Sequence, residues 1–124
     1  MDSERNIMIM KEDQIVIYQT EDGQTQIDVR VENDTVWLTQ AQMAELFLKD
    51  QSVVARHINN AFKEGELEEK SNMQILHNTQ YKYRPTKVYN LGVIISVGYC
   101  VKSKRGTAFR IWARNVIKNY LLKA

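Results

Sequence analysis

The sequence contains one cysteine and one proline, and it has no acidic residue after Glu69. A single cysteine cannot form an internal disulfide, which favours a reducing compartment, so we expect a cytoplasmic protein. The longest weakly polar run, Leu91 to Val101, is well short of the roughly 20 residues that span a bilayer. The first five residues do not have the pattern of a signal peptide. These absences argue against a membrane-spanning or secreted protein.

The length and composition fit one compact domain. The chain has 124 residues, of which 44% are hydrophobic and 26% are charged. A domain of this size buries about two thirds of its unfolded surface, so it needs no metal or disulfide to fold. We expect residues 1–13 to form a loose leader and residues 14–124 a single domain. Because the chain stops almost at the end of its last predicted helix, we expect it to be a fragment of a longer protein.

The two signs of charge are segregated along the chain. Residues 1–69 hold all 15 acidic residues and six basic ones, whereas residues 70–124 hold 11 basic residues and no acidic one. The net charge of +2 therefore conceals a strongly basic C-terminal half. This asymmetry favours an anionic partner such as a nucleic acid. The alternative is that the basic half packs against the acidic half of the chain or against an acidic protein.

The N-terminal third has the pattern of three short strands. Residues 15–18 and 26–31 are rich in β-branched side chains, and the turn sequence Asp22-Gly23 lies between them. In the second run the apolar side chains alternate with polar ones, which places on one face Ile27, Val29 and Val31. Asn33-Asp34 predicts another turn, and residues 35–38 predict a third strand.

Two short helices are predicted next. Thr39 is placed as the N-cap of a helix over residues 40–47, and Asp50 or Ser52 can cap a second helix that ends near Gly65. The apolar stripe of the first helix is Met43, Leu46 and Phe47, and that of the second is Val54, Ile58, Ala61 and Phe62. This pair has the outline of a helix-turn-helix, although Leu48 occupies the tight turn where glycine is usual.

The C-terminal half completes the predicted fold. Residues 73–76 and 87–89 are strand-like, and with the polar span between them they would form a wing. Asn90 can cap a helix over residues 91–99, and a last helix spans roughly residues 106–122. Its apolar face, either core or a dimer seam, comprises Phe109, Trp112, Ala113, Val116, Ile117, Tyr120 and Leu121. We therefore predict an α+β fold: a winged helix-turn-helix with an N-terminal β-hairpin and a long amphipathic C-terminal helix.

The second predicted helix has a polar face opposite its apolar stripe. Helical spacing aligns on one side Ser52, Arg56, Asn59 and Lys63. Arginine pairs with guanine and asparagine with adenine through two hydrogen bonds each, and in a helix-turn-helix the second helix enters the major groove. Arg56 and Asn59 are therefore predicted to read bases, with Ser52, Asn60 and Lys63 in support. The alternative is an ordinary solvated helix face.

Further basic residues are candidates for phosphate contacts. They lie in the expected wing, before the last helix and along it: Lys82, Arg84, Lys102, Lys104, Arg105, Arg110 and Arg114. Each phosphate that such a side chain neutralises would steepen the salt dependence of binding. A solvated helix face explains the basic line on the last helix equally well, and strand packing explains the alternation from Tyr81 to Arg84.

The sequence shows no pattern of a catalytic or metal site. The only histidines, His57 and His77, are isolated from any cysteine or paired carboxylates. Cys100 lies inside an apolar helix, and we expect a buried structural thiol there rather than a nucleophile. The five glycines are scattered and form no phosphate-binding loop. We therefore expect no metal, no cofactor and no enzymatic activity, with an enzyme as the third alternative.

Two parts of the sequence closely resemble the virulence RhuM family. The resemblance is carried upstream by residues 52–60 and 62–67 and downstream by residues 89–91, 94–99 and 102–113. It runs from about Ile15 to the end of the chain. Residues 104–113 are also distantly similar to the end of phage Bro-N and KilA-N type DNA-binding modules.

The resemblance implies a bacterial protein of a family often encoded on phage-derived or pathogenicity-island DNA. Some relatives accompany Fic-type toxin domains, and the name of the family records a virulence phenotype rather than a chemistry. We expect the protein to bind duplex DNA, either as a regulator or as the targeting module of a longer protein. A homodimer is one expected state of the protein. The rival is an antitoxin-like or adaptor module whose basic face docks an acidic protein, such as a Fic-type toxin.

Overall fold

The computed structural model describes residues 15–65, 67–76 and 86–123, and their side chains as far as residue 120. The predicted leader and the candidate wing residues Lys82 and Arg84 lie outside this part of the chain. The described elements are, in order, β1 (Ile15–Gln19), β2 (Gln26–Glu32), β3 (Thr35–Thr39), α2 (Gln40–Phe47), α3 (Gln51–Lys63), α4 (Glu69–Asn72), β4 (Met73–Leu76), β5 (Thr86–Asn90), α5 (Leu91–Cys100) and α6 (Lys104–Lys123). The predicted α+β class is confirmed.

The strands form one antiparallel sheet in the order β1-β2-β3-β5-β4. Both predicted turns have the left-handed backbone that tight hairpins need, with φ of +73° at Gly23, 54° at Asn33 and 62° at Asp34. In β2 the alternation is as predicted, because Ile27, Val29 and Val31 are buried while Gln26 and Asp28 are exposed. One face of this hairpin therefore belongs to the core.

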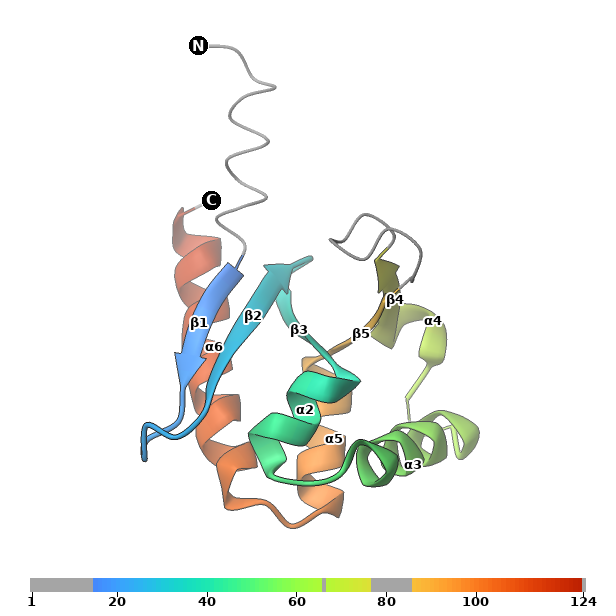
Figure 1. Cartoon of the computed structure of the whole chain (residues 1–124). Helices are drawn as coiled ribbons and strands as arrows, with labels where there is room; N and C mark the ends of the chain where they lie inside the picture. Colours follow the sequence, from blue (N-terminus) through green and yellow to red (C-terminus); the bar gives the residue numbers. More distant parts are fainter. Residues whose placement is uncertain (1–14, 66, 77–85, 124) are drawn as a thin grey trace.

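The helix pair is inserted between two strands that lie side by side. β3 pairs with β5, with Leu38 opposite Tyr89, although α2, α3, α4 and β4 intervene in the sequence. β4 then pairs with β5 from Met73 opposite Tyr89 to Leu76 opposite Thr86. This connectivity anchors both ends of the α2–α3 segment to the sheet (Figure 1).

Two of the predicted helix caps are present. The Thr39 hydroxyl accepts a hydrogen bond from the Gln42 backbone N–H, and the Gln42 side chain accepts one from the Thr39 N–H, which completes a capping box. The Asn90 side chain accepts from the Val93 N–H at the start of α5. α3 begins after Asp50, whose side chain makes no capping hydrogen bond.

The turn between α2 and α3 is left-handed in spite of its residue. Leu48 has φ 55° and ψ 50°, a conformation that costs a residue other than glycine about 1–2 kcal/mol. Its side chain is 65% exposed, so packing of the leucine does not explain the conformation. The turn is held instead by backbone hydrogen bonds from the Leu48 and Lys49 N–H groups to the carbonyls of Glu45 and Ala44. The predicted short connection between the two helices is confirmed.

The last helix closes the core. α6 packs against α5, β3 and α2, and its buried Phe109 contacts Tyr18 of β1 edge to face with 5.1 Å between ring centroids. Trp112 contacts the same tyrosine at 4.8 Å. The helix begins slightly before the predicted position, and its apolar face packs against the core through Phe109, Trp112, Ala113, Val116, Ile117 and Tyr120. Of the two predicted uses of this face, the structure shows the core.

Candidate nucleic-acid interface

α3 presents the predicted polar face to solvent. Its buried side chains, Val54, Ile58 and Ala61, lie on one side of the helix. All the side chains predicted to contact DNA from this helix are exposed: Ser52, Arg56, Asn59, Asn60 and Lys63. The helix contains no acidic residue between Gln51 and Lys63, so its exposed face is polar and positively charged.

Two glutamines that the sequence reasoning did not select connect the starts of the two helices. The Gln40 side-chain amide donates a hydrogen bond of 3.3 Å to the side-chain oxygen of Gln51. Each is the first residue of its helix, α2 and α3 respectively. In a helix-turn-helix the first helix crosses the phosphate backbone where the second enters the groove. In the sequence, these two glutamines could have been recognised by their position at the starts of the two predicted helices.

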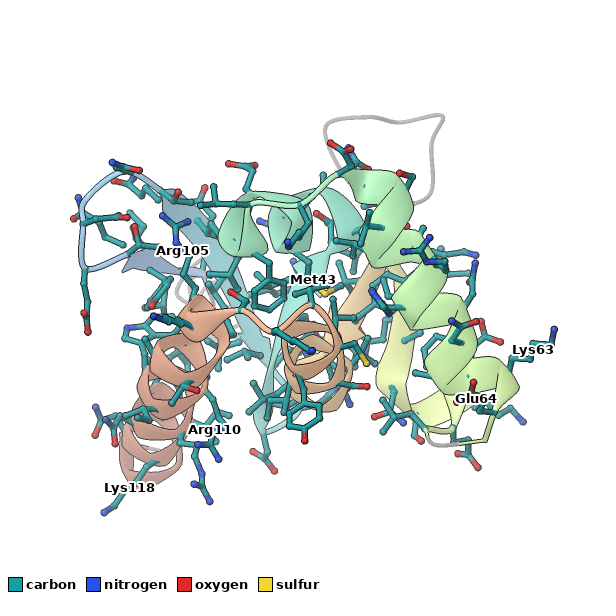
Figure 2. All side chains as sticks on the ribbon, turned by 90° about the horizontal axis from the view of Figure 1, so that it is seen from below. Met43, Lys63, Glu64, Arg105, Arg110 and Lys118 are labelled. Atoms are coloured by element: carbon teal, nitrogen blue, oxygen red, sulfur yellow. The ribbon has the colours of Figure 1, made fainter. Side chains whose placement is uncertain are left out.

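The remaining predicted cations of the described residues lie outside α3. α5 packs against both α3 and α6, and the view from below places it between them (Figure 2). Lys102 occupies the turn after α5, and Lys104, Arg110 and Arg114 follow on α6. Lys102, Lys104 and Arg114 are exposed, and Arg110 is half-buried. The structure therefore groups the candidate contacts into two sets, one on α3 and one on the α5–α6 turn and α6.

Arg105 has a structural role. Its guanidinium bonds the Asp22 carboxylate at 2.8 Å, the Thr25 hydroxyl at 3.0 Å and the Leu46 backbone carbonyl at 3.2 Å, and its side chain is only 16% exposed. These bonds tie the start of α6 to the β1–β2 turn and to the end of α2. The predicted phosphate contact of Arg105 stays a prediction, and it would compete with these bonds within the fold.

The contact between Arg105 and the β1–β2 turn should make stability sensitive to acid. Hydrogen bonds from the Thr20 hydroxyl and the Gln24 backbone N–H, together with Arg105, lower the pKa of Asp22 to about 2. A carboxyl with a lowered pKa in the folded state stabilises the fold above its ordinary pKa of about 3.9. That contribution disappears as the pH falls through about 2.

We expect Asp22→Asn to reduce the loss of stability between about pH 4 and pH 2. Urea denaturation at several pH values would measure this loss. Asp28→Asn, which neutralises an exposed carboxylate on β2, is the control. If Asp22→Asn and the unmodified chain lost the same stability between about pH 4 and pH 2, Asp22 would not be the source of the acid sensitivity.

Cys100 is exposed, so the prediction of a buried thiol is wrong. Cys100 does lie in the predicted apolar helix, but the side of α5 that faces the core is formed by Val93, Ile94 and Val97. The helix is apolar nearly all round, and an apolar sequence of this kind does not reveal which side faces the core. Among the described residues, no group of three or more histidine, cysteine and acidic side chains could hold a metal ion.

Comparison with known proteins gives one match. The chain is an α+β domain with an exposed basic helix face, and the model of the Virulence protein RhuM family matches residues 66–124. The predicted resemblance to this family is confirmed over these residues, which make up just under half of the chain. The match begins after α3 and extends from α4 to the end of α6.

No curated protein and no solved structure is significantly similar to the chain. The more distant similarity to Bro-N and KilA-N modules is not shown and stays a prediction. In the part of the chain that the structure describes, no helix has both the length and the apolar character needed to cross a membrane.

Proposed function

We propose that this chain binds duplex DNA through a winged helix-turn-helix, with α3 as the recognition helix. The observation that carries the proposal is the exposure of the whole polar face of α3 opposite a fully apolar buried stripe. Arg56 and Asn59 have the side chains that recognise guanine and adenine in the major groove. Ser52, Asn60 and Lys63 would contact the phosphates or support the base contacts.

The order of the strands supports this class of DNA-binding fold. In a winged helix, one strand precedes the helix pair, and a hairpin follows whose second strand pairs with that first strand. Here β3 precedes α2 and α3, the hairpin is β4–β5, and the corresponding part of the sheet has the order β3-β5-β4. The three residues between α2 and α3 fit the short turn of the motif. The extra short helix α4 between α3 and β4 departs from the simplest form.

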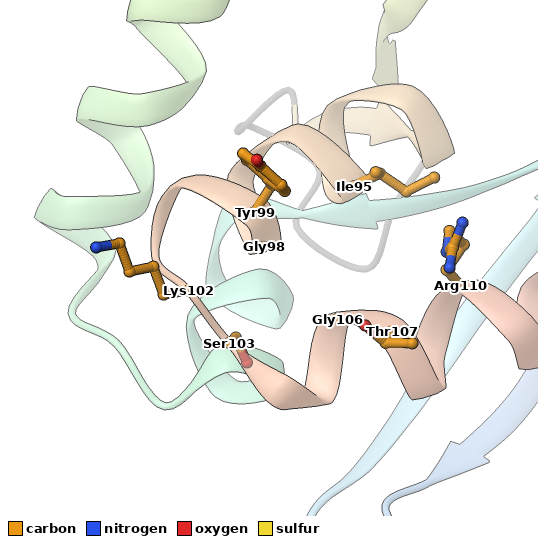
Figure 3. Close-up of a pocket in the computed structure, with 8 residues that line it drawn as sticks. All are labelled: Ile95, Gly98, Tyr99, Lys102, Ser103, Gly106, Thr107 and Arg110. Atoms are coloured by element: carbon orange, nitrogen blue, oxygen red, sulfur yellow. The ribbon is translucent and has the colours of Figure 1, made fainter.

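The basic residues of the C-terminal half add a second, sequence-independent contribution. Lys102 and Lys104 are exposed near the α5–α6 turn, and in Figure 3 the Lys102 side chain points to the side on which α3 lies. Salt-dependent contacts of this kind position a protein on the duplex without reading its sequence. We assign Arg110 and Arg114 a lesser share because α5 separates them from α3.

Fluorescence anisotropy with a labelled duplex tests the proposal. With a mixed-sequence duplex of about 30 base pairs, we expect micromolar or tighter binding at roughly 50 mM salt that weakens steeply towards roughly 200 mM. The double substitution Arg56→Ala, Asn59→Ala should weaken binding about tenfold, because it removes one cation and one amide from the proposed recognition face.

The matched control is the double substitution Lys118→Ala, Asn119→Ala, which removes the same two kinds of side chain from the exposed side of α6. Both pairs are exposed, so both variants should keep their stability within about 0.5 kcal/mol. Equal losses of affinity in the two variants would show that binding depends on overall charge and not specifically on the face of α3. No binding at low salt would refute the proposed function.

A further inference from the structure

An open groove of about 620 Å³ lies between α5 and α6. Figure 3 shows Ile95 and Tyr99 on the α5 wall and Arg110 at one end of the groove; Lys102 lines the other end, where its side chain points away towards α3. The groove is distinct from the exposed face of α3, because α5 lies between α3 and α6 (Figure 2). The proposed function therefore leaves most of it unused.

Two glycines lie where the walls of this groove meet. An ideal Cβ on Gly98 would lie 3.5 Å from the Cα of Gly106 and 2.9 Å from the Phe47 ring. A Cβ at either position would make only ordinary contact with the other helix, so the tight contact at this crossing is the one between Gly98 and Phe47. The buried Phe47 supports the crossing from below, so the groove rests on a rigid part of the core.

The wall formed by α5 is apolar and exposed. Tyr99 is 85% exposed and Ile95 is 38% exposed, and they lie one helical turn apart on the same side of α5. Side chains of this size gain free energy when another surface covers them. The exposed apolar part of the groove is small, so it fits one apolar side chain of a partner rather than a broad apolar surface.

The two ends of the groove are positively charged and unopposed. Among the described residues the ion pairs join Arg30 to Glu32 and Arg105 to Asp22, so neither involves Lys102 or Arg110. No acidic residue follows Glu69 in the sequence, so α5, the turn and α6 supply no carboxylate to either end. Both cations are thus available to an acidic partner.

We propose that this groove binds an acidic peptide segment of another protein, with one apolar side chain between two carboxylates. The apolar side chain would cover Ile95 and Tyr99, and the carboxylates would pair with Arg110 and with Lys102, whose exposed side chain would turn from α3 towards the groove. Lys102 and Arg110 line opposite ends of the groove, so the two carboxylates must flank the apolar side chain.

The shape and lining favour a peptide over nucleic acid. Duplex DNA presents regularly spaced phosphates, which would use the two cations and leave the apolar wall uncovered. An acidic peptide with an apolar centre satisfies the wall and both ends together. Charged residues at the rim would set the rate and specificity of association, and the apolar centre would supply most of the affinity.

A designed probe tests this with the full chain. The probe is a fluorescein-labelled peptide with the central sequence Glu-Ser-Leu-Ser-Glu, and two matched peptides replace either the leucine by serine or both glutamates by lysine. We expect the first peptide to bind with a Kd below about 1 mM and the other two to bind at least tenfold more weakly. In a ¹⁵N-labelled chain the amide signals of Gly98 and Gly106 should shift, while those of Gly23 and Gly65 should not.

Single substitutions locate the binding. Tyr99→Ala and Arg110→Ala should each weaken binding of the probe severalfold, whereas Ile111→Ala, an exposed apolar side chain of α6 outside the groove, should not. Tyr99 is so exposed that its loss should leave the fold intact, and the dispersion of the amide spectrum checks this.

Three results would overturn the proposal. The first is no saturable binding of the probe. The second is equal binding of the serine-centred peptide, which would indicate attraction of charge alone. The third is a shift of the Gly98 and Gly106 signals by duplex DNA but not by the peptide, which would assign the groove to nucleic acid. None of these outcomes depends on whether α3 binds DNA.

Discussion

Phe109→Ala should lower the free energy of unfolding by about 3–5 kcal/mol, the usual cost of removing a buried phenylalanine. The side chain is 1% exposed and is among the largest fully buried side chains. Its ring contacts Tyr18 at 5.1 Å and Trp112 at 5.6 Å between centroids. The substitution would therefore remove apolar burial, leave a cavity and break one aromatic contact that joins α6 to β1 and a second one within α6.

Urea denaturation measures this loss as a lower midpoint with an unchanged slope. Ile111→Ala is the control, because it shortens a side chain on the same helix that is 53% exposed, and it should change stability by no more than about 0.5 kcal/mol. A loss below about 1 kcal/mol in Phe109→Ala would mean that α6 does not close the core as described.

Gly98→Ala should destabilise the protein although alanine is the better helix former. The added methyl group would lie 2.9 Å from the Cζ atom of Phe47 and 3.0 Å from its Cε1 atom. Phe47 is 3% exposed, so its ring is enclosed by the core. Overpacking of this kind costs about 1–3 kcal/mol, against a gain of up to about 1 kcal/mol in helix propensity.

Gly92→Ala on the same helix separates these two effects. A Cβ there lies no closer than 3.4 Å to its neighbours, the side-chain oxygens of Asn72 and Asn90, which is ordinary contact. The variant should keep or slightly increase the stability of the protein, so the two alanine variants should differ by roughly 2 kcal/mol. Equal midpoints in urea would show that α5 shifts away from Phe47 without cost.

Local patterns in the sequence predicted most of the elements. The turn at Asp22-Gly23, the caps at Thr39 and Asn90, and the apolar stripes of α3 and α6 depend on neighbouring residues, and each is present. α5 formed as predicted in spite of its β-branched residues, because its Asn90 cap and its burial against the core outweigh their weaker preference for helix. The exposed polar face of α3 follows from helical spacing alone.

Features that depend on contacts distant in sequence were not predictable in this way. The pairing of β3 with β5 joins strands on either side of the helix pair, and no local pattern indicates it. The internal bonds of Arg105 required the β1–β2 turn to lie beside the start of α6. Cys100 is exposed because α5 turns its other side to the core, which an almost uniformly apolar helix does not reveal.

The contact between the first described strand and the last helix has a consequence for biosynthesis. The ribosome releases β1 and β2 long before α6, so Tyr18 in the nascent chain lacks the Phe109 and Trp112 rings that it contacts in the folded protein. The helix pair and its neighbouring strands can assemble earlier, because their contacts are closer in sequence. Emergence of Phe109 and Trp112 therefore decides when the newly made chain stops being a target for chaperones and proteases.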